Sequence, residues 1–202
     1  MPYSQFETIE EVADKFDIEV IDKNIIKMLE IEIAHYPFSE ITNRLQDSMS
    51  FINETTICED IIKPILLQIK KQYSSLYIWS HVAYNVDKDN GLFGEPDYLI
   101  AARAKHGGMN IPPLCIMEAK KENWDKGWAQ TLAEMYAAST QGAATCYGVV
   151  TTGKAWEFGQ LHNKIFAKDP NHISATDNLQ KVFDILNWLF NEVDKILYLT
   201  TK

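Results

Sequence analysis

Residues 114–120, Leu-Cys-Ile-Met-Glu-Ala-Lys, narrow the choice of fold for this chain. The run is apolar on both of its alternating sides up to Glu118. Side chains of a β-strand point alternately to the two faces of a sheet, so a strand of this kind must be covered on both faces. The run therefore predicts a central strand of a sheet that carries packed helices.

The sequence from residue 53 onward alternates helical and strand-like patterns. An apolar stripe of helical period covers residues 53–73, where Asn53 can cap the start and Pro64 can introduce a kink. Aromatic and β-branched runs predict strands at 74–86, 96–104, 114–120, 145–152 and 154–161. Helical patterns occupy 123–143 and about 176–199, and residues 163–175 read as irregular with an edge strand. This order predicts an α/β fold, a mixed β-sheet flanked by helices.

Residues 1–50 have a different character. A Thr8-to-Glu11 capping box predicts a short helix, and Ile25, Leu29 and Ile33 recur at helical spacing in a segment that stops before Pro37. A further short helix is expected at 39–49. We therefore expect an N-terminal helical extension, residues 1–50, followed by an α/β domain, residues 51–202.

Three charged residues stand at the ends of two predicted strands. Asp97 opens one strand, Glu118 closes another, and Lys120 lies two residues further on the same face. If the two strands form an antiparallel hairpin, these groups converge, because neighbouring strands lie about 4.8 Å apart. Two close carboxylates repel each other unless a proton or a cation lies between them, and a hard divalent cation prefers oxygen ligands.

These residues carry a resemblance to a known family. Pro96-Asp97 followed by Glu118-Ala119-Lys120 resembles the signature of the PD-(D/E)XK, restriction-endonuclease-like phosphodiesterase superfamily. Residues 53–66 are similar to the first helix of the N-terminal nuclease domain in type I restriction enzyme R subunits, with Glu54 and Pro64 at the matching positions. The resemblance covers about residues 53–160.

A glutamine motif of part of the superfamily is matched incompletely. Gln130 resembles its Gln, but Glu134 stands where a Tyr is usual, and Tyr136 comes two residues later. The departure leaves open whether the chain shares that subgroup's use of the motif.

The resemblance implies a metal-dependent nuclease that hydrolyses DNA phosphodiester bonds. It implies a Mg²⁺ site, which Mn²⁺ can also occupy, formed by Asp97 and Glu118 with the Ala119 carbonyl. Lys120 would orient the attacking water and stabilise developing charge, and Gln130 would orient Lys120 or the DNA backbone. Glu54 would reach the metal through water or hold a second ion, with Glu59 as the alternative helix carboxylate.

Each residue also has a simpler interpretation. Asp97 after a proline can be a turn residue, Glu118 and Lys120 a solvated strand end, and Glu54 an acidic residue favoured by a helix N-terminus. Gln130 can be a solvated helix residue. A glycosidase would also use two carboxylates, but the nearby Lys120 favours an anionic substrate. The main alternative is a nuclease-like domain that binds nucleic acid or a partner subunit without catalysis.

Composition bears on location and partners. The net charge of −9, from 28 acidic and 19 basic residues, argues against a protein that holds nucleic acid by a broad basic face. No run is long and apolar enough for a transmembrane helix, and the first residues lack the pattern of a signal peptide. The widely separated Cys58, Cys115 and Cys146 suggest neither disulfides nor zinc motifs, so we expect a cytoplasmic protein without membrane partners.

The C-terminal helical segment is apolar over more of its surface than packing on one sheet face requires, which suggests a further contact. Its apolar residues form one seam, and Phe183, Trp188, Phe190 and Leu197 lie off that seam. A helix that covers one sheet face needs a single stripe, so Trp188 and Phe190 would be exposed on a monomer. Either residues 1–50 cover this surplus, or a two-fold homodimer does.

Overall fold

The computed structural model describes residues 2–200 and contains a mixed eight-stranded β-sheet flanked by helices. Seven strands follow the order β1-β7-β6-β5-β4-β3-β2, and β8 pairs with β6 beside β7. The strands are β1 (Glu19–Asp22), β2 (Leu76–Ser80), β3 (Tyr98–Ala102), β4 (Cys115–Ala119), β5 (Thr145–Thr151), β6 (Ala155–His162), β7 (Ile165–Lys168) and β8 (Ile173–Ser174). The predicted α/β class is confirmed.

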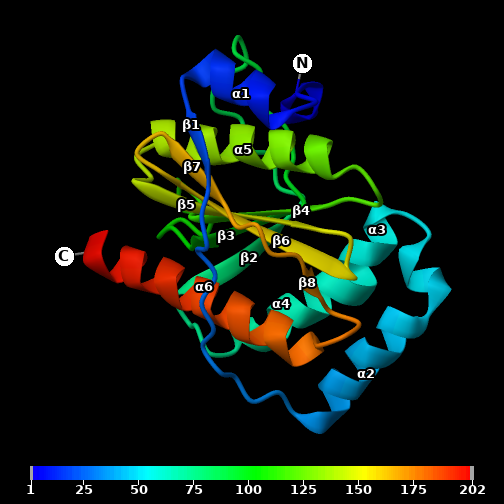
Figure 1. The fold of residues 1–202 in the computed structure, drawn as a ribbon. Coiled ribbons are helices and arrows are strands. Elements are labelled where there is room, and N and C mark those ends of the chain that lie inside the picture. Colours follow the sequence, from blue (N-terminus) through cyan, green and yellow to red (C-terminus); the bar gives the residue numbers. More distant parts are fainter. Residues whose placement is uncertain (1, 201–202) are drawn as a thin grey trace.

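Helices cover both faces of the sheet (Figure 1). Helices α1 and α5 lie on one face, and α4 and α6 lie on the other, with α2 and α3 beside α4. The helices are α1 (Ile9–Phe16), α2 (His35–Gln46), α3 (Glu54–Ile57), α4 (Lys63–Lys70), α5 (Trp124–Thr140) and α6 (Leu179–Thr200), and short turns η1 (Tyr3–Gln5), η2 (Ser48–Phe51) and η3 (Cys58–Ile62) accompany them. None of the described helices has the length and apolarity needed to span a bilayer.

Strand β4 lies inside the sheet, as its sequence predicts. It pairs antiparallel with β3 and parallel with β5, and all five of its residues are buried. Helix α5 connects β4 to β5 in the manner expected for parallel neighbours. This arrangement places the end of β4 beside the start of β3.

The helix start signals are correct in two places. Thr8 caps α1 by accepting a hydrogen bond from the Glu11 amide, and Asn53 caps α3 in a reciprocal capping box with Thr56. The following segment continues as a π-helical turn, η3, before α4 with Pro64 in its first turn. The helical stripe of residues 53–73 is thus three joined pieces around one buried face.

The expected helical extension of residues 1–50 is wrong in part. Residues 23–34 contain no helix, and the chain before them forms β1, which pairs in parallel with β7. A distant side chain explains why the apolar spacing did not produce a helix. Asp169 Oδ2 accepts hydrogen bonds from the Ile25 and Ile26 amides at 2.7 and 2.9 Å. These bonds satisfy amides that a helix would otherwise pair, so the segment runs extended across the domain.

The last helix is covered by the chain itself. Trp188 and Phe190 are buried, so the expectation that they are exposed is wrong. Asp184 of α6 accepts hydrogen bonds from the amides of Leu29 and Ile31, and Asn187 donates to the Leu29 carbonyl. The Trp188 ring packs against Tyr147 of β5 and the Phe190 ring against Tyr73. The chain itself therefore buries the apolar surplus, and the homodimer loses the observation that motivated it.

Two strands lie within residues 163–175, where one edge strand is expected. β8 pairs with β6 alone, as an edge strand does. β7 has partners on both sides, β6 and β1, so it is an interior strand. The seven-strand order ends at β1 and β2. The N-terminal strand was missed because Glu19–Asp22 has only four residues, most of them exposed, and no apolar alternation.

Helix α5 approaches the sheet closely because glycines replace side chains beneath it. A Cβ at Gly148 of β5 would lie 2.6 Å from Met135 Sδ and 2.9 Å from Thr131 Cγ2, both in α5. At Gly159 of β6 it would lie 2.9 Å from two ring atoms of Trp128. The tight contact buries the polar groups that α5 presents to the sheet.

Gly148→Ala should destabilise the protein by about 1–3 kcal/mol, because the added methyl group overpacks this contact. Urea unfolding of the two proteins measures the difference. Adding Met135→Ala should make the double variant less unstable than the sum of the two single changes, since it opens space for the methyl group. Wild-type stability in Gly148→Ala would contradict the close contact.

Candidate functional site

The β3–β4 hairpin brings Asp97 and Glu118 together, as the sequence predicts. Tyr98 pairs with Met117 in the antiparallel register, so Asp97, one residue earlier, faces Glu118, one residue later. The site lies at the ends of these two neighbouring strands, where β3 begins and β4 ends.

Each carboxylate is held by the backbone of the opposite strand. The Asp97 amide donates to Glu118 Oε1 at 3.2 Å, and the Ala119 amide donates to Asp97 Oδ2 at 2.8 Å. One oxygen of each acid is therefore used in fixing the hairpin. Asp97 Oδ1 and Glu118 Oε2 face the other side chains of the site.

Lys120 completes the group. Its Nζ lies 3.1 Å from Glu118 Oε2, and both side chains are almost fully buried. Gly127 of α5 leaves room for the lysine, since a Cβ there would lie 2.9 Å from Lys120 Cγ. When both acids are ionised, two carboxylates face one ammonium group, which leaves one excess negative charge at a buried site.

The pKa shifts follow from this arrangement. Burial, together with the charge of Asp97, raises the pKa of Glu118 above its ordinary value, although Lys120 opposes the shift. Burial alone would lower the pKa of Lys120, but the carboxylates of Glu118, Glu54 and Asp97 outweigh it and raise that pKa. Lys120 therefore stays cationic, and the charged form of Glu118 is disfavoured unless a cation joins the site.

The remaining predicted residues, Glu54, Glu59 and Gln130, lie on the helical segments α3, η3 and α5. Glu54 is exposed in the first turn of α3, and its charge acts on Lys120. Glu59, one turn on, is also exposed and is not among the groups that shift the pKa of Lys120. Gln130 of α5 donates to Glu134 Oε1 at 3.1 Å, so it contacts neither Lys120 nor the carboxylates of the hairpin by a hydrogen bond.

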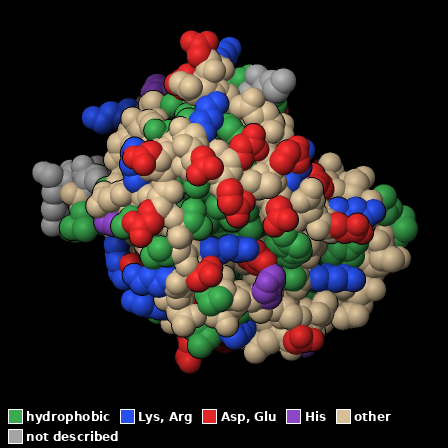
Figure 2. Space-filling view, turned by 45° about the horizontal axis from the view of Figure 1, so that its top comes forward, with side chains coloured by type: hydrophobic (Ala, Val, Ile, Leu, Met, Phe, Trp, Pro, Cys, Tyr) green, Lys and Arg blue, Asp and Glu red, His purple; other side chains and the backbone are tan. Residues whose placement is uncertain are grey.

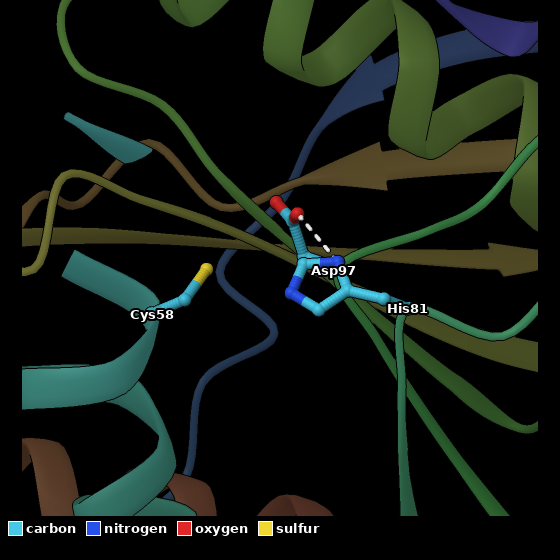
Figure 3. A group of neighbouring side chains, drawn as sticks. All are labelled: Cys58, His81 and Asp97. Carbon is cyan, nitrogen blue, oxygen red and sulfur yellow. Dashed lines mark ion pairs between the residues drawn. The ribbon is translucent and has the colours of Figure 1, made fainter. Parts of the chain in front are cut away.

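Sequence reasoning missed two residues beside Asp97. His81, just after β2, has its Nδ1 at 3.6 Å from Asp97 Oδ1, and the Cys58 side chain points toward the same carboxylate from η3 (Figure 3). The histidines of the sequence form no ligand-like spacing, so nothing in that pattern singles out His81. Its place after an aromatic strand that pairs with β3 was the only signal available.

Glu134 is a second missed group. It is fully buried on α5, at the position where the related motif carries a Tyr. Burial raises its pKa well above the ordinary value, and the nearby Glu118 adds to the shift. Among the described residues, its Oε2 and the hydroxyls of Tyr3 and Tyr84 have no hydrogen-bond partner. A buried acid whose pKa is raised therefore lies behind the hairpin site.

A third buried carboxylate lies two strands away on the same face. Glu118 pairs with Val150 of β5, and Val150 pairs with Glu157 of β6. Glu157 contacts Lys168 at 3.0 Å and His172 at 2.9 Å, and it accepts a hydrogen bond from the Trp128 indole. This acid is satisfied by its own donors, unlike the pair at the hairpin.

The chain matches no protein-family model and no curated protein.

Glu134→Gln should stabilise the protein increasingly as the pH rises. A folded-state pKa above the ordinary value of 4.5 means that unfolding releases a proton above that pH, so the wild type loses stability as the pH rises toward the folded pKa. The variant does not titrate there, and its advantage should grow by up to about 1.4 kcal/mol per pH unit. Its amide oxygen can still accept from Gln130.

Urea unfolding at pH 5 and pH 8 measures this trend. Glu157→Gln is the contrasting control, because it removes a carboxylate that is paired with Lys168 and contacts His172, and it should lower stability. An advantage of Glu134→Gln that is the same at both pH values would contradict a protonated Glu134.

Proposed function

We propose that this protein is a metal-dependent nuclease that hydrolyses DNA phosphodiester bonds. The observation that carries the proposal is the convergence of Asp97, Glu118 and Lys120 where β3 begins and β4 ends. Burying Glu118 and Lys120 beside the partly buried Asp97 is costly, and a fold with no use for these groups would be expected to replace them with apolar residues. Perturbed, clustered ionisable groups are typical of catalytic sites.

The donor set fits Mg²⁺ or Mn²⁺. Asp97 Oδ1 and Glu118 Oε2 remain after the backbone amides have taken the other two oxygens, and hard divalent cations prefer such ligands. The excess negative charge of the buried group favours a bound cation. When bound, the ion would polarise the scissile phosphate and acidify a water molecule.

The side chains would then have separate tasks. Asp97 and Glu118 would bind the ion, and Lys120, released from Glu118, would hold the attacking water and stabilise the negative charge that develops on the phosphate. Glu54 would reach the ion through water from the first turn of α3. Gln130, which donates to Glu134 in this structure, would orient Lys120 or contact the DNA backbone.

The order of the elements supports a restriction-endonuclease-like core. Helices α3 and α4 precede β2, β3 and β4, and α5 then leads to β5. In this order Glu54 lies on the first helix, Asp97 precedes β3 and Glu118 lies on β4, which agrees with what the superfamily resemblance implies. The N-terminal strand β1 and its partner β7 are additions to that core.

The surface charge argues for local contacts with DNA. Figure 2 shows acidic side chains across the middle of the face in view, with basic side chains scattered among and around them. The exposed Lys121 donates to the Ile52 carbonyl beside the site, and Lys126 is paired with Glu7 at 2.6 Å. A partner subunit or a second copy of the chain would add basic surface to a cytoplasmic nuclease of this charge.

The acidic surface also favours a second candidate, a nuclease-like subunit that binds nucleic acid or a partner without cutting. Its net charge of −9 would limit unaided DNA binding. The intact set of Asp97, Glu118 and Lys120 favours catalysis over this alternative.

Lys120→Ala should lower DNA cleavage by about 10²–10³-fold, because one preorganised donor at the transition state contributes about 2.7–4 kcal/mol. Cleavage of single-stranded, duplex and branched DNA with Mn²⁺ is the assay. Lys121→Ala is the matched control, since it removes the neighbouring exposed lysine. Wild-type protein that cuts none of these substrates would favour the non-catalytic subunit, and cleavage that survives in Lys120→Ala would show that the lysine is misassigned.

Asp97→Ala should abolish measurable Mn²⁺ binding in calorimetric titration, because it removes a ligand that no neighbouring oxygen replaces. Glu54→Gln should weaken binding and Glu59→Gln should leave it unchanged, since only Glu54 acts on Lys120. Equal affinity of wild type and Asp97→Ala would refute the metal site. A loss in Glu59→Gln instead of Glu54→Gln would reassign the helix carboxylate.

A further inference from the structure

Three different metal-ligating atoms meet beside the hairpin. Cys58 Sγ, a His81 ring nitrogen and an Asp97 carboxylate oxygen all lie within 4.8 Å of one another (Figure 3). They come from η3, from the end of β2 and from the start of β3, so the tertiary fold alone brings them together.

Cys58 is held firmly in this position. The Tyr98 hydroxyl donates to the Cys58 carbonyl at 2.9 Å, which fixes the first residue of the π-helical turn against β3. Such turns occur often at functional sites. Burial, with the charges of Asp97, Glu118 and Glu54, raises the pKa of the Cys58 thiol to about 12, and a bound dication would offset those same charges.

His81 occupies a strained conformation. Its φ is 49°, in the left-handed region that non-glycine residues rarely adopt, and its amide donates to the Asp97 carbonyl at 3.1 Å. The imidazole is half exposed, with Nδ1 turned toward Asp97 Oδ1. Backbone strain of this kind persists where the surrounding structure enforces it, and it is concentrated at functional sites.

We propose that Cys58, His81 and Asp97 bind a transition-metal ion of the zinc class. A sulfur, an imidazole nitrogen and a carboxylate oxygen match the ligands of Zn²⁺ and Co²⁺, whereas Mg²⁺ prefers oxygen alone. Three protein ligands leave one tetrahedral position open at the exposed side of His81. The ligand geometry carries this site whether or not the protein cuts DNA.

The two metal sites share one residue. Asp97 would serve Mg²⁺ together with Glu118, or the softer ion together with Cys58 and His81. Because Asp97 Oδ2 is fixed by the Ala119 amide, Oδ1 is the oxygen that both ions require. Binding of the softer ion should therefore exclude Mg²⁺ from Asp97.

Titration of the full chain with Co²⁺ tests the site. The cysteines are kept reduced by a reductant that is not a thiol, so that only cysteines of the protein can bind Co²⁺ through sulfur. Wild type should develop a thiolate-to-cobalt charge-transfer band and visible bands of tetrahedral intensity, and Zn²⁺ should displace both. Cys58→Ser should lose the charge-transfer band. Cys115→Ser and Cys146→Ser are matched controls, since both cysteines are also buried, and they should keep it.

His81→Asn removes the imidazole but suits the left-handed backbone, so it should fold normally and bind Co²⁺ at least about tenfold more weakly. Glu118→Gln should keep the charge-transfer band, because Glu118 is not a ligand of this site. Circular dichroism checks the fold of each variant. Stabilisation of wild type by Zn²⁺ against thermal unfolding, reduced in His81→Asn, is a readout that needs no cysteine variant.

Absence of the band in wild type, or its survival in Cys58→Ser, would overturn the proposal, as would unchanged affinity in His81→Asn. The outcome is separable from nuclease activity. A cobalt band in a protein that cuts no DNA would support this site and count against the nuclease. Mg²⁺-dependent cleavage by a protein that gives no band would remove this site alone.

Discussion

The antiparallel register of β3 and β4 is the constraint on which the site depends. It sets Asp97 against Glu118, and each acid accepts the backbone amide of the other strand. These charge-assisted hydrogen bonds offset part of the cost of burying two like charges side by side. A slip of one residue would turn Glu118 and Lys120 to the other face of the sheet and separate them from α5. The chemistry of the site and the pairing of its strands are therefore one feature.

Burial of the site depends in turn on how closely α5 lies on the sheet. Gly127 leaves space for the Lys120 stem, and Gly148 lets the helix approach β5. The N-terminal segment then seals the outer side: the Tyr3 amide donates to the Phe93 carbonyl, and the Tyr3 ring packs at Gly94, three residues before Asp97. Residues that the sequence places far outside the resemblance thus help to position the strand that carries Asp97.

The sequence was informative where one local pattern had one structural outcome. The doubly apolar run of β4 could only be an interior strand, and the caps at Thr8 and Asn53 act over three residues, so these predictions held. The helix expected across residues 22–36 failed because Asp169 and Asp184 bind its backbone amides from distant elements. Trp188 of α6 is buried without a second copy of the chain, because its ring packs edge-on against Tyr147 of β5. Interactions more than a hundred residues apart leave no periodicity to read.

The site also combines residues that local sequence predicts with residues that only the tertiary structure brings together. Asp97, Glu118 and Lys120 could be placed from strand alternation and one assumed hairpin, but Cys58 and His81 lie on elements that meet Asp97 only in the folded chain. The proximity of Cys58 and His81 changes which metal ions the Asp97 carboxylate can help to bind. With Glu118 alone, Asp97 offers hard oxygen ligands, whereas with Cys58 and His81 it belongs to a softer set. Only one oxygen of Asp97 is free of a backbone hydrogen bond, so the two ligand sets share that oxygen. The fold therefore makes Asp97 the residue that the two proposed metal sites have in common.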